Sequence, residues 1–271
     1  MAGKDYAAIA AKRITKPSTI KKFPRVLVVA RQKKGKSTLL TTVGVENILI
    51  LDPEHGTDEM KVKDPNVWHI EKWEDLDDAL NYLRFVEHPY KWVGVDGLTK
   101  MSNMALKYVM KLQEDKSLDR IPGMVQQRDY GKAGELMKDM INRCHALKMG
   151  VIFTSQERQD EGFDSEEDED AEEASAVYVA DLPKGVRGYV NSIVDVIARL
   201  YVVNVDEKPE RRLWIGESLK YDTGYRSDYV LPPFIRKPTI PKLVRLMRTG
   251  SEKMPTANAP AKAPAKAPAK K

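Results

Sequence analysis

The sequence contains a single cysteine, Cys144, among its 271 residues. One cysteine forms no disulfide within the chain and supplies no cysteine cluster for a metal, so disulfide-stapled and zinc-ribbon scaffolds are excluded. No segment approaches the roughly 20 apolar residues of a membrane span, and the N-terminal stretch has no apolar run of signal-peptide length. We therefore expect a soluble protein of a reducing, cytoplasmic compartment.

Aromatic residues are also few, at 7%, and neither sign of charge dominates. The 45 lysines and arginines stand against 40 acidic residues, which leaves a formal net charge of +5. That balance permits a nucleic-acid partner without indicating one. Hydrophobic residues make up 42% of the chain, which is enough for one large α/β domain or two small ones.

Composition divides the chain into a core and several polar segments. Residues 1–24 are polar and basic and predict a short helix with a lead-in, whereas 25–240 should form the domain. Inside it, 113–128 is a predicted loop, and 157–181 holds a dense acidic run that should be mobile. The Ala/Pro/Lys repeat of 251–271 predicts a solvated tail, with a weak electrostatic tether to nucleic acid as the alternative.

Apolar runs alternate with helical patterns throughout the predicted domain. Runs typical of buried strands fall at 25–30, 47–51, 67–70, 92–96, 151–154, 193–203 and 212–215. Apolar residues at helical spacing span 73–83, 98–112 and 133–147. This order predicts an α/β fold with a mainly parallel twisted sheet, helices on both faces and antiparallel C-terminal strands. Cys144 lies on the apolar stripe of its helix and should be a core residue.

The stretch VVARQKKGKSTLL, from Val28 to Leu40, has most of a phosphate-binding loop. Gly35, Lys36 and Ser37 match the end of the pattern G-x-x-x-x-G-K-[ST], and Ala30 replaces its first glycine. The stretch follows a buried strand and precedes a helix, so unpaired N–H groups would meet phosphates there. The predicted nucleotide-binding residues are Ala30, Arg31, Gln32, Lys33, Lys34, Gly35, Lys36, Ser37 and Thr38.

Three further strand ends carry polar side chains that fit ATP and Mg²⁺. Asp52 and Glu54 follow the second strand, at the edge where ligands bind in open α/β sheets. Asp96 closes the fourth strand in the manner of a Walker B carboxylate, which with Ser37 would hold the metal. Glu54 is the best candidate for the general base, with Lys36 as the phosphate-binding cation. Gln156, after the fifth strand, would sense the γ-phosphate.

The order of GKS, LDPEHG, VGVD and FTSQ resembles the RecA-like P-loop ATPase core. More closely, LDPEHGTDEM, WVGVDGLTKM and the run from QRDYGKAGEL to VIFTSQ resemble phage-encoded RecA-like proteins, which include single-strand annealing and recombination proteins. The resemblance covers roughly residues 22–235. It implies that Glu54 is the catalytic base and that Gln156 couples the nucleotide to DNA-binding loops.

The resemblance also implies DNA contacts and assembly. Loops at 113–128 and 157–181 would face single-stranded DNA, although the acidic run of the second is a departure that should repel phosphates. Basic candidates for DNA contact are Lys116, Arg120, Arg128, Lys184 and Arg187. The last two flank a glycine, which suits a flexible basic contact. In head-to-tail oligomers of this family, basic residues of the next subunit complete the ATP site, and Lys220 and Arg226 resemble such residues.

These patterns together predict an ATPase that binds single-stranded DNA and promotes annealing or strand exchange in phage-type recombination or repair. The resemblance implies a ring or filament of identical subunits in the host cytoplasm, with a single-strand-binding protein as a further partner. Two alternatives stay open. One is a nucleotide-regulated annealing module with little turnover, motivated by Ala30, and the other is a hexameric DNA motor.

Overall fold

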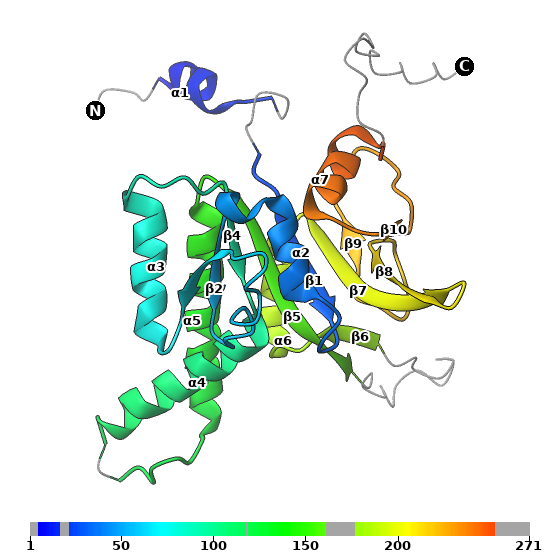
Figure 1. The fold of residues 1–271 in the computed structure, drawn as a ribbon. Helices are drawn as coiled ribbons and strands as arrows, with labels where there is room; N and C mark the ends of the chain where they lie inside the picture. The colour runs from blue at the N-terminus through cyan, green and yellow to red at the C-terminus, as the bar shows by residue number, and fades with distance from the viewer. Residues whose placement is uncertain (1–4, 17–21, 118, 161–176, 253–271) are drawn as a thin grey trace, which may run out of the picture.

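We analysed a computed structural model, which describes residues 5–16, 22–117, 119–160 and 177–252. The strands of the main sheet follow the order β10-β8-β7-β1-β5-β4-β2-β3 (Figure 1). From β3 to β7 every neighbouring pair is parallel, whereas β8 and β10 are antiparallel to their neighbours. The predicted class, a mainly parallel α/β sheet with antiparallel C-terminal strands, is confirmed.

The strands and helices succeed one another as βαβ units. The strands are β1 (Arg25–Ala30), β2 (Ile48–Asp52), β3 (Asn66–His69), β4 (Trp92–Val95), β5 (Gly150–Asp160), β6 (Val177–Ala180), β7 (Val196–Val205), β8 (Lys208–Trp214), β9 (Gly224–Tyr225) and β10 (Phe234–Arg236). The α-helices are α1 (Tyr6–Arg13), α2 (Lys36–Leu40), α3 (Trp73–Phe85), α4 (Leu98–Glu114), α5 (Gln127–Ala146), α6 (Lys184–Ile193) and α7 (Ile240–Thr249).

Two apolar clusters pack against opposite faces of the sheet. One joins the parallel strands to α3, α4, α5 and α6, and contains Cys144, which is fully buried as predicted. Burial raises the pKa of its thiol to about 12, so it stays protonated and unreactive at neutral pH. The other cluster joins β1, β2 and the C-terminal strands to α2 and α7. Because both faces are covered, the buried parts of the central strands, such as 26–30 in β1 and 48–51 in β2, are continuous apolar runs.

Several elements differ from the predicted boundaries. α5 begins at Gln127 instead of near 133, so the predicted loop 113–128 is shortened to 115–126, at the end of the projecting α4–α5 pair (Figure 1). The predicted run 193–203 is divided, because α6 ends at Ile193 and β7 begins at Val196. β5 extends to Asp160, where it pairs with β6.

Parts of the predicted segments lie outside the described residues. These are most of the acidic run in 157–181 and nearly all of the tail 251–271. A short helix, α1, does occur within the predicted lead-in. Within the described part of the chain, no helix is both long and apolar enough to cross a membrane.

Candidate nucleotide site

A pocket of about 560 Å³ opens where β1, β2, β4 and β5 end. Its lining comes from the phosphate-loop stretch, the segment after β2, two strand ends and one residue of β8: Gln32, Lys33, Gly35, Lys36, Ser37, Thr38, Glu54, Gly56, Met60, Asp96, Gln156 and Arg211. Parallel strands carry their ends to one edge of the sheet, which is why residues as far apart in sequence as Gln32 and Gln156 meet here. Arg211 reaches the pocket from β8, which is antiparallel to β7.

The phosphate-loop stretch turns sharply before α2. Gly35 has φ +96°, a left-handed conformation that favours glycine, and Lys33 also has positive φ. The Lys36 ammonium donates to the carbonyls of Ala30, at 3.2 Å, and Arg31, at 3.3 Å. Burial lowers the pKa of Lys36, while the carboxylates of Asp96 and Glu54 oppose that shift. The lysine is therefore held across the loop, within reach of any anion that enters the pocket.

Not every residue of the predicted nucleotide-binding run lines this pocket. Ala30 is fully buried at the end of β1, inside the apolar cluster that contains α2. Arg31 is exposed to solvent, and Lys34 contributes its backbone carbonyl to a contact described below. The Ala30 side chain, which replaces the first glycine of the pattern, thus packs in the core and does not line the pocket.

Asp96 and Ser37 form the oxygen-rich corner of the pocket. Thr154 donates its hydroxyl to Asp96 Oδ1 at 2.5 Å. Burial raises the pKa of Asp96, and hydrogen bonds from Ser37 and Thr154 oppose this shift. A carboxylate and a hydroxyl in contact are ligands that Mg²⁺ accepts alongside phosphate oxygens. The donor set therefore fits the metal that the sequence predicted.

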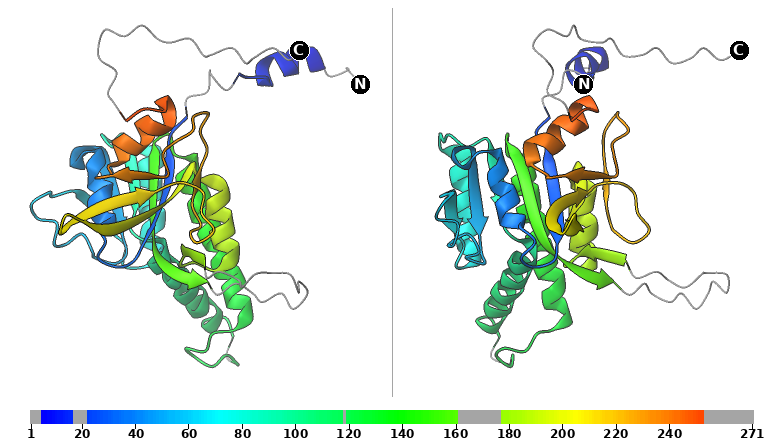
Figure 2. Two further views of the ribbon diagram at one scale, coloured as in Figure 1. Left: turned by 90° about the vertical axis from the view of Figure 1, so that its right-hand side faces the viewer. Right: turned by 45° about the vertical axis from the view of Figure 1, so that its right-hand side comes forward.

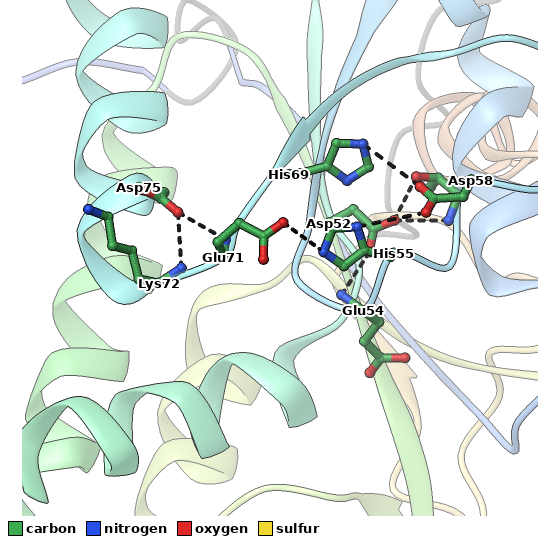
Figure 3. A network of polar contacts seen from close by, with 9 residues as sticks. Asp52, Glu54, His55, Asp58, His69, Glu71, Lys72 and Asp75 are labelled. Atoms are coloured by element: carbon green, nitrogen blue, oxygen red, sulfur yellow. Dashed lines mark hydrogen bonds and ion pairs between the residues drawn. The ribbon is translucent and has the colours of Figure 1, made fainter.

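The segment after β2 is held by Asp52 (Figure 3). Asp52 is fully buried, and its carboxylate accepts from the Glu54 N–H at 2.9 Å and from the N–H and hydroxyl of Thr57 at 2.9 and 2.6 Å. All these donors belong to its own loop. Asp52 thus sets the backbone of the segment that carries Glu54, and it does not point into the pocket as a ligand.

A second set of polar contacts ties the far side of this segment to β3 (Figure 3). The rings of His55 and His69 stack with centroids 4.7 Å apart. Asp58 lies 3.8 Å from a ring nitrogen of each, and Glu71 lies 3.1 Å from His55 Nε2. Asp52 on one side and this histidine pair on the other restrain the turn that carries Glu54.

Glu54 faces Lys36 and Asp96 across the pocket. Desolvation and the neighbouring Asp96 carboxylate raise the pKa of Glu54, while Lys36 lowers it in part. A carboxylate with a raised pKa takes a proton more readily than an ordinary one, which suits a general base.

Gln156 completes the wall opposite the loop. Its side-chain oxygen accepts from Gln32 Nε2 at 3.3 Å, and its N–H donates to Thr99 Oγ1 at 3.1 Å. The amide therefore touches the phosphate loop directly while its backbone is fixed to the start of α4.

Arg211 is a pocket residue that the sequence did not reveal. It projects from β8 over the phosphate loop, where its Nε donates to the Lys34 carbonyl at 3.2 Å. A Cβ at Gly35 would lie 2.9 Å from that Nε. No local motif marks Arg211, since it stands in an ordinary-looking run, RRLW; only the packing of β8 beside β7 brings it to the pocket.

One predicted DNA contact is wrong. The Arg120 side chain is 1% exposed and forms a two-pronged ion pair with Asp129, whose side chain is fully buried. This pairing lowers the pKa of Asp129 and uses the guanidinium to fasten the 115–126 loop to α5. From the same predicted set, Lys116 is exposed in that loop and Arg128 is exposed in the first turn of α5.

The other predicted basic contacts lie on α6 instead of on a flexible segment. Lys184 is exposed in its first turn. Arg187 has a side chain only 12% exposed, and it pairs with Asp160 at 2.7 Å. Val186 and Val190 bury one face of this helix, which explains why a glycine-containing stretch is ordered.

The two predicted trans-acting residues lie away from this chain's own pocket. Lys220 is exposed near the C-terminal strands. Arg226 donates to the Ser192 carbonyl at 2.7 Å and lines a separate hollow with Lys22 and Asp195. Their part in a neighbouring subunit's site stays a prediction.

The fold and this pocket together define a P-loop ATPase. The chain belongs to the AAA domain family, whose model matches residues 22–227. Among solved structures, it is similar to a KaiC-like protein from the hyperthermophilic archaeon Pyrococcus horikoshii OT3, with 11% identity and a TM-score of 0.41 over 79% of this chain and 89% of that chain. No curated protein matches the sequence.

Proposed function

We propose that this ATPase binds ATP with Mg²⁺, hydrolyses it, and uses the cycle to act on single-stranded DNA in phage-type recombination or repair. The observation that supports hydrolysis is the meeting of Lys36, Ser37, Asp96 and Glu54 around one pocket. The DNA substrate is supported by the resemblance described above and by the exposed Lys116 and Arg128.

Each pocket residue has a distinct part in phosphoryl transfer to water. Lys36 and the N–H groups of the loop hold the β- and γ-phosphates, because cation and donors neutralise oxygens that carry negative charge. The Glu54 carboxylate orients the attacking water and takes its proton. Gln156 and Arg211 line the same pocket, and in this proposal they contact the γ-phosphate or the developing charge.

Ser37 and Asp96 would hold the metal. When bound, Mg²⁺ supplies charge neutralisation between the phosphate oxygens. Thr154 donates a hydrogen bond that orients the Asp96 carboxylate, and metal-binding side chains are commonly oriented by such hydrogen bonds.

We also propose that identical subunits assemble and share ATP sites. Neither Lys220 nor Arg226 lines the chain's own pocket, as is required of residues donated to a neighbouring subunit. A single-strand-binding protein would act as a loading partner on DNA. Removing Arg226 in one subunit should then lower turnover at its neighbour's site, which mixed oligomers would reveal.

ATP turnover with and without single-stranded DNA tests the proposal. Lys36→Ala should abolish hydrolysis, and Glu54→Gln should retain ATP binding while losing turnover by about 100-fold or more. The rate at which complementary oligonucleotides anneal, measured with a fluorophore on each strand, should rank the wild-type protein and these two variants in the same order as ATP turnover.

The variants also separate the alternatives. Wild-type protein that binds ATP and anneals strands, yet turns over no faster than Glu54→Gln, would be a nucleotide-regulated annealing module. ATP-driven strand unwinding would identify a motor. The recombination role would be refuted if single-stranded DNA left the turnover rate unchanged and the protein annealed no strands.

A further inference from the structure

One face of the C-terminal strands is left without a helix among the described residues. β8 and β10 give their apolar side chains, Leu213 and Ile235, to the cluster that contains α7. Their alternate residues do not take part in the cluster of α3 to α6 on the other side. In Figures 1 and 2 the β7–β8 hairpin reaches beyond those helices.

Aromatic rings and arginines occupy this open face in rows. Strand register aligns Arg199 of β7 with Trp214 of β8 and Phe234 of β10. The next row aligns Tyr201 with Arg212 and Arg236. We call this surface the aromatic face, defined by Arg199, Tyr201, Arg212, Trp214, Phe234 and Arg236.

The rings and guanidinium groups are stacked on one another. Trp214 and Phe234 lie nearly parallel, with centroids 6.2 Å apart and planes 18° apart. The Arg212 guanidinium lies 4.8 Å from the Phe234 ring centroid. The Arg199 guanidinium lies 4.2 Å from the Tyr221 ring and 5.5 Å from the Tyr178 ring, and its side chain is 17% exposed, so these tyrosines cover that end of the face. Such contacts hold the rings in place, so little conformational entropy remains to be lost when a ligand stacks on them.

Cations and carboxylates alternate on and beside this face. Arg212 and Arg236 both bind the Glu210 carboxylate, and these hydrogen bonds lower the pKa of Glu210 to about 2. Arg199 pairs with Glu157. Lys208, which shares the face by alternation along β8, adds a cation in addition to the three arginines. The acidic turn at Asp206 and Glu207 closes one end, where phosphates would be repelled.

We propose that the aromatic face binds single-stranded nucleic acid, with bases stacked on Trp214 and Phe234 and phosphates beside Arg236, whose side chain is 57% exposed. Aromatic rings interleaved with arginines on a half-exposed sheet suit unpaired bases, because every base offers a flat face and every nucleotide a negative charge. A duplex keeps its bases stacked inside and gains nothing from such rings.

β8 links this face to the nucleotide pocket. Successive residues of a strand point to opposite faces. Arg211 therefore reaches the phosphate loop, while Glu210 and Arg212 on either side of it lie on the aromatic face. A nucleotide in the pocket and a nucleic-acid strand on the aromatic face would therefore contact adjacent residues of one strand, Arg211 and Arg212.

Binding of fluorescein-labelled oligo(dT) tests the assignment, which rests on the proposed function for its DNA substrate. Trp214→Leu combined with Phe234→Leu keeps apolar bulk and removes the rings. We expect this variant to lose affinity about tenfold or more, since stacking contributes ~1–3 kcal/mol per base. Arg84→Gln combined with Phe85→Leu is the matched control, because that exposed arginine–phenylalanine pair lies at the end of α3.

Tryptophan fluorescence gives a second readout that does not depend on loss of binding. Oligo(dT) should quench wild-type emission, and the change should be smaller in Trp214→Phe, which still binds. An oligo(U) arm distinguishes DNA from RNA as the preferred strand. Retained folding is checked by ATP-analogue binding in every variant.

The outcomes separate the two proposals. Full affinity in the leucine variant, with loss in Lys116→Gln/Arg128→Gln, would overturn the aromatic face and leave the recombination role intact. A changed oligomeric state in the leucine variant would reassign the face to a subunit contact. Failure of the wild-type protein to bind oligo(dT) with or without ATP would refute the DNA role itself.

Discussion

Replacing Gly35 with alanine should lower both the stability of the fold and the affinity for ATP, and these two effects have different causes. Gly35 has φ +96°, and a left-handed conformation costs an L-residue about 1–2 kcal/mol. The new Cβ would also lie 2.9 Å from Arg211 Nε. That nitrogen belongs to a flexible side chain, so Arg211 can move and the backbone need not. We therefore expect the free energy of unfolding to fall by about 1–2 kcal/mol, set by φ alone.

The displacement of Arg211 should have a larger effect on ATP than on folding. Its Nε would lose the Lys34 carbonyl, and its guanidinium would leave the position it holds beside the phosphate loop. Hydrogen bonds to charged groups contribute about 1.5–3 kcal/mol. Gly35→Ala should therefore weaken binding of a fluorescent ATP analogue about ten- to one-hundredfold.

Gly123 offers the matched control. It has φ +78°, and nothing lies within 4 Å of the Cβ that alanine would add. Gly123→Ala should lower stability in urea by up to the same amount and leave ATP-analogue affinity unchanged. Arg211→Ala should weaken binding without a cost in stability, and Gly35→Ala/Arg211→Ala should weaken it no further. Wild-type affinity in Gly35→Ala, with the stability loss present, would refute the role given to Arg211.

Three more variants test single contacts. Arg120→Ala should lower the thermal midpoint by several degrees, because it leaves the buried Asp129 unpaired, whereas Lys116→Ala should leave it unchanged; equal midpoints would contradict the buried pair. The raised pKa of Glu54 predicts that turnover falls with decreasing pH already above the ordinary carboxyl pKa of about 4.3, since the deprotonated form is the base, and Glu54→Gln should show no such limb in its residual rate. Thr154→Val should raise the Mg²⁺ concentration for half-maximal turnover about tenfold through Asp96, and Thr154→Ser, which keeps the hydroxyl, should restore it.

The parts of the site that sequence reasoning brought together are those at the ends of consecutive parallel strands. Lys36, Glu54, Asp96 and Gln156 each follow an apolar run, and parallel pairing carries those ends to one edge. The fold class followed from the same alternation. Short-range patterns were sufficient because each of these residues is positioned by its own strand.

Residues positioned by long-range packing were missed or misread. Arg120 stands in a polar stretch, and only the packing of the 115–126 loop against α5 shows that its charge is buried. A glycine between Lys184 and Arg187 suggested a flexible basic contact, whereas Val186 and Val190 are buried and hold this segment as α6. In both cases tertiary contacts overrode a local propensity that favoured exposure or disorder.

β8 illustrates most clearly why the remainder of the site was hidden. Its sequence, KPERRLW, contains two adjacent arginines that look equivalent. Alternation along the strand sends Arg211 to the phosphate loop and Arg212 to the Phe234 ring on the other side. The two charges thus belong to two different surfaces, although a single peptide bond joins them. Packing alone does not account for arginines on both faces of β8 beyond the core. Each arginine has a charge that must be exposed or paired, whereas a leucine at the same position would have none. Their placement is accounted for if β8 contacts a phosphate on one face and a nucleic-acid strand on the other.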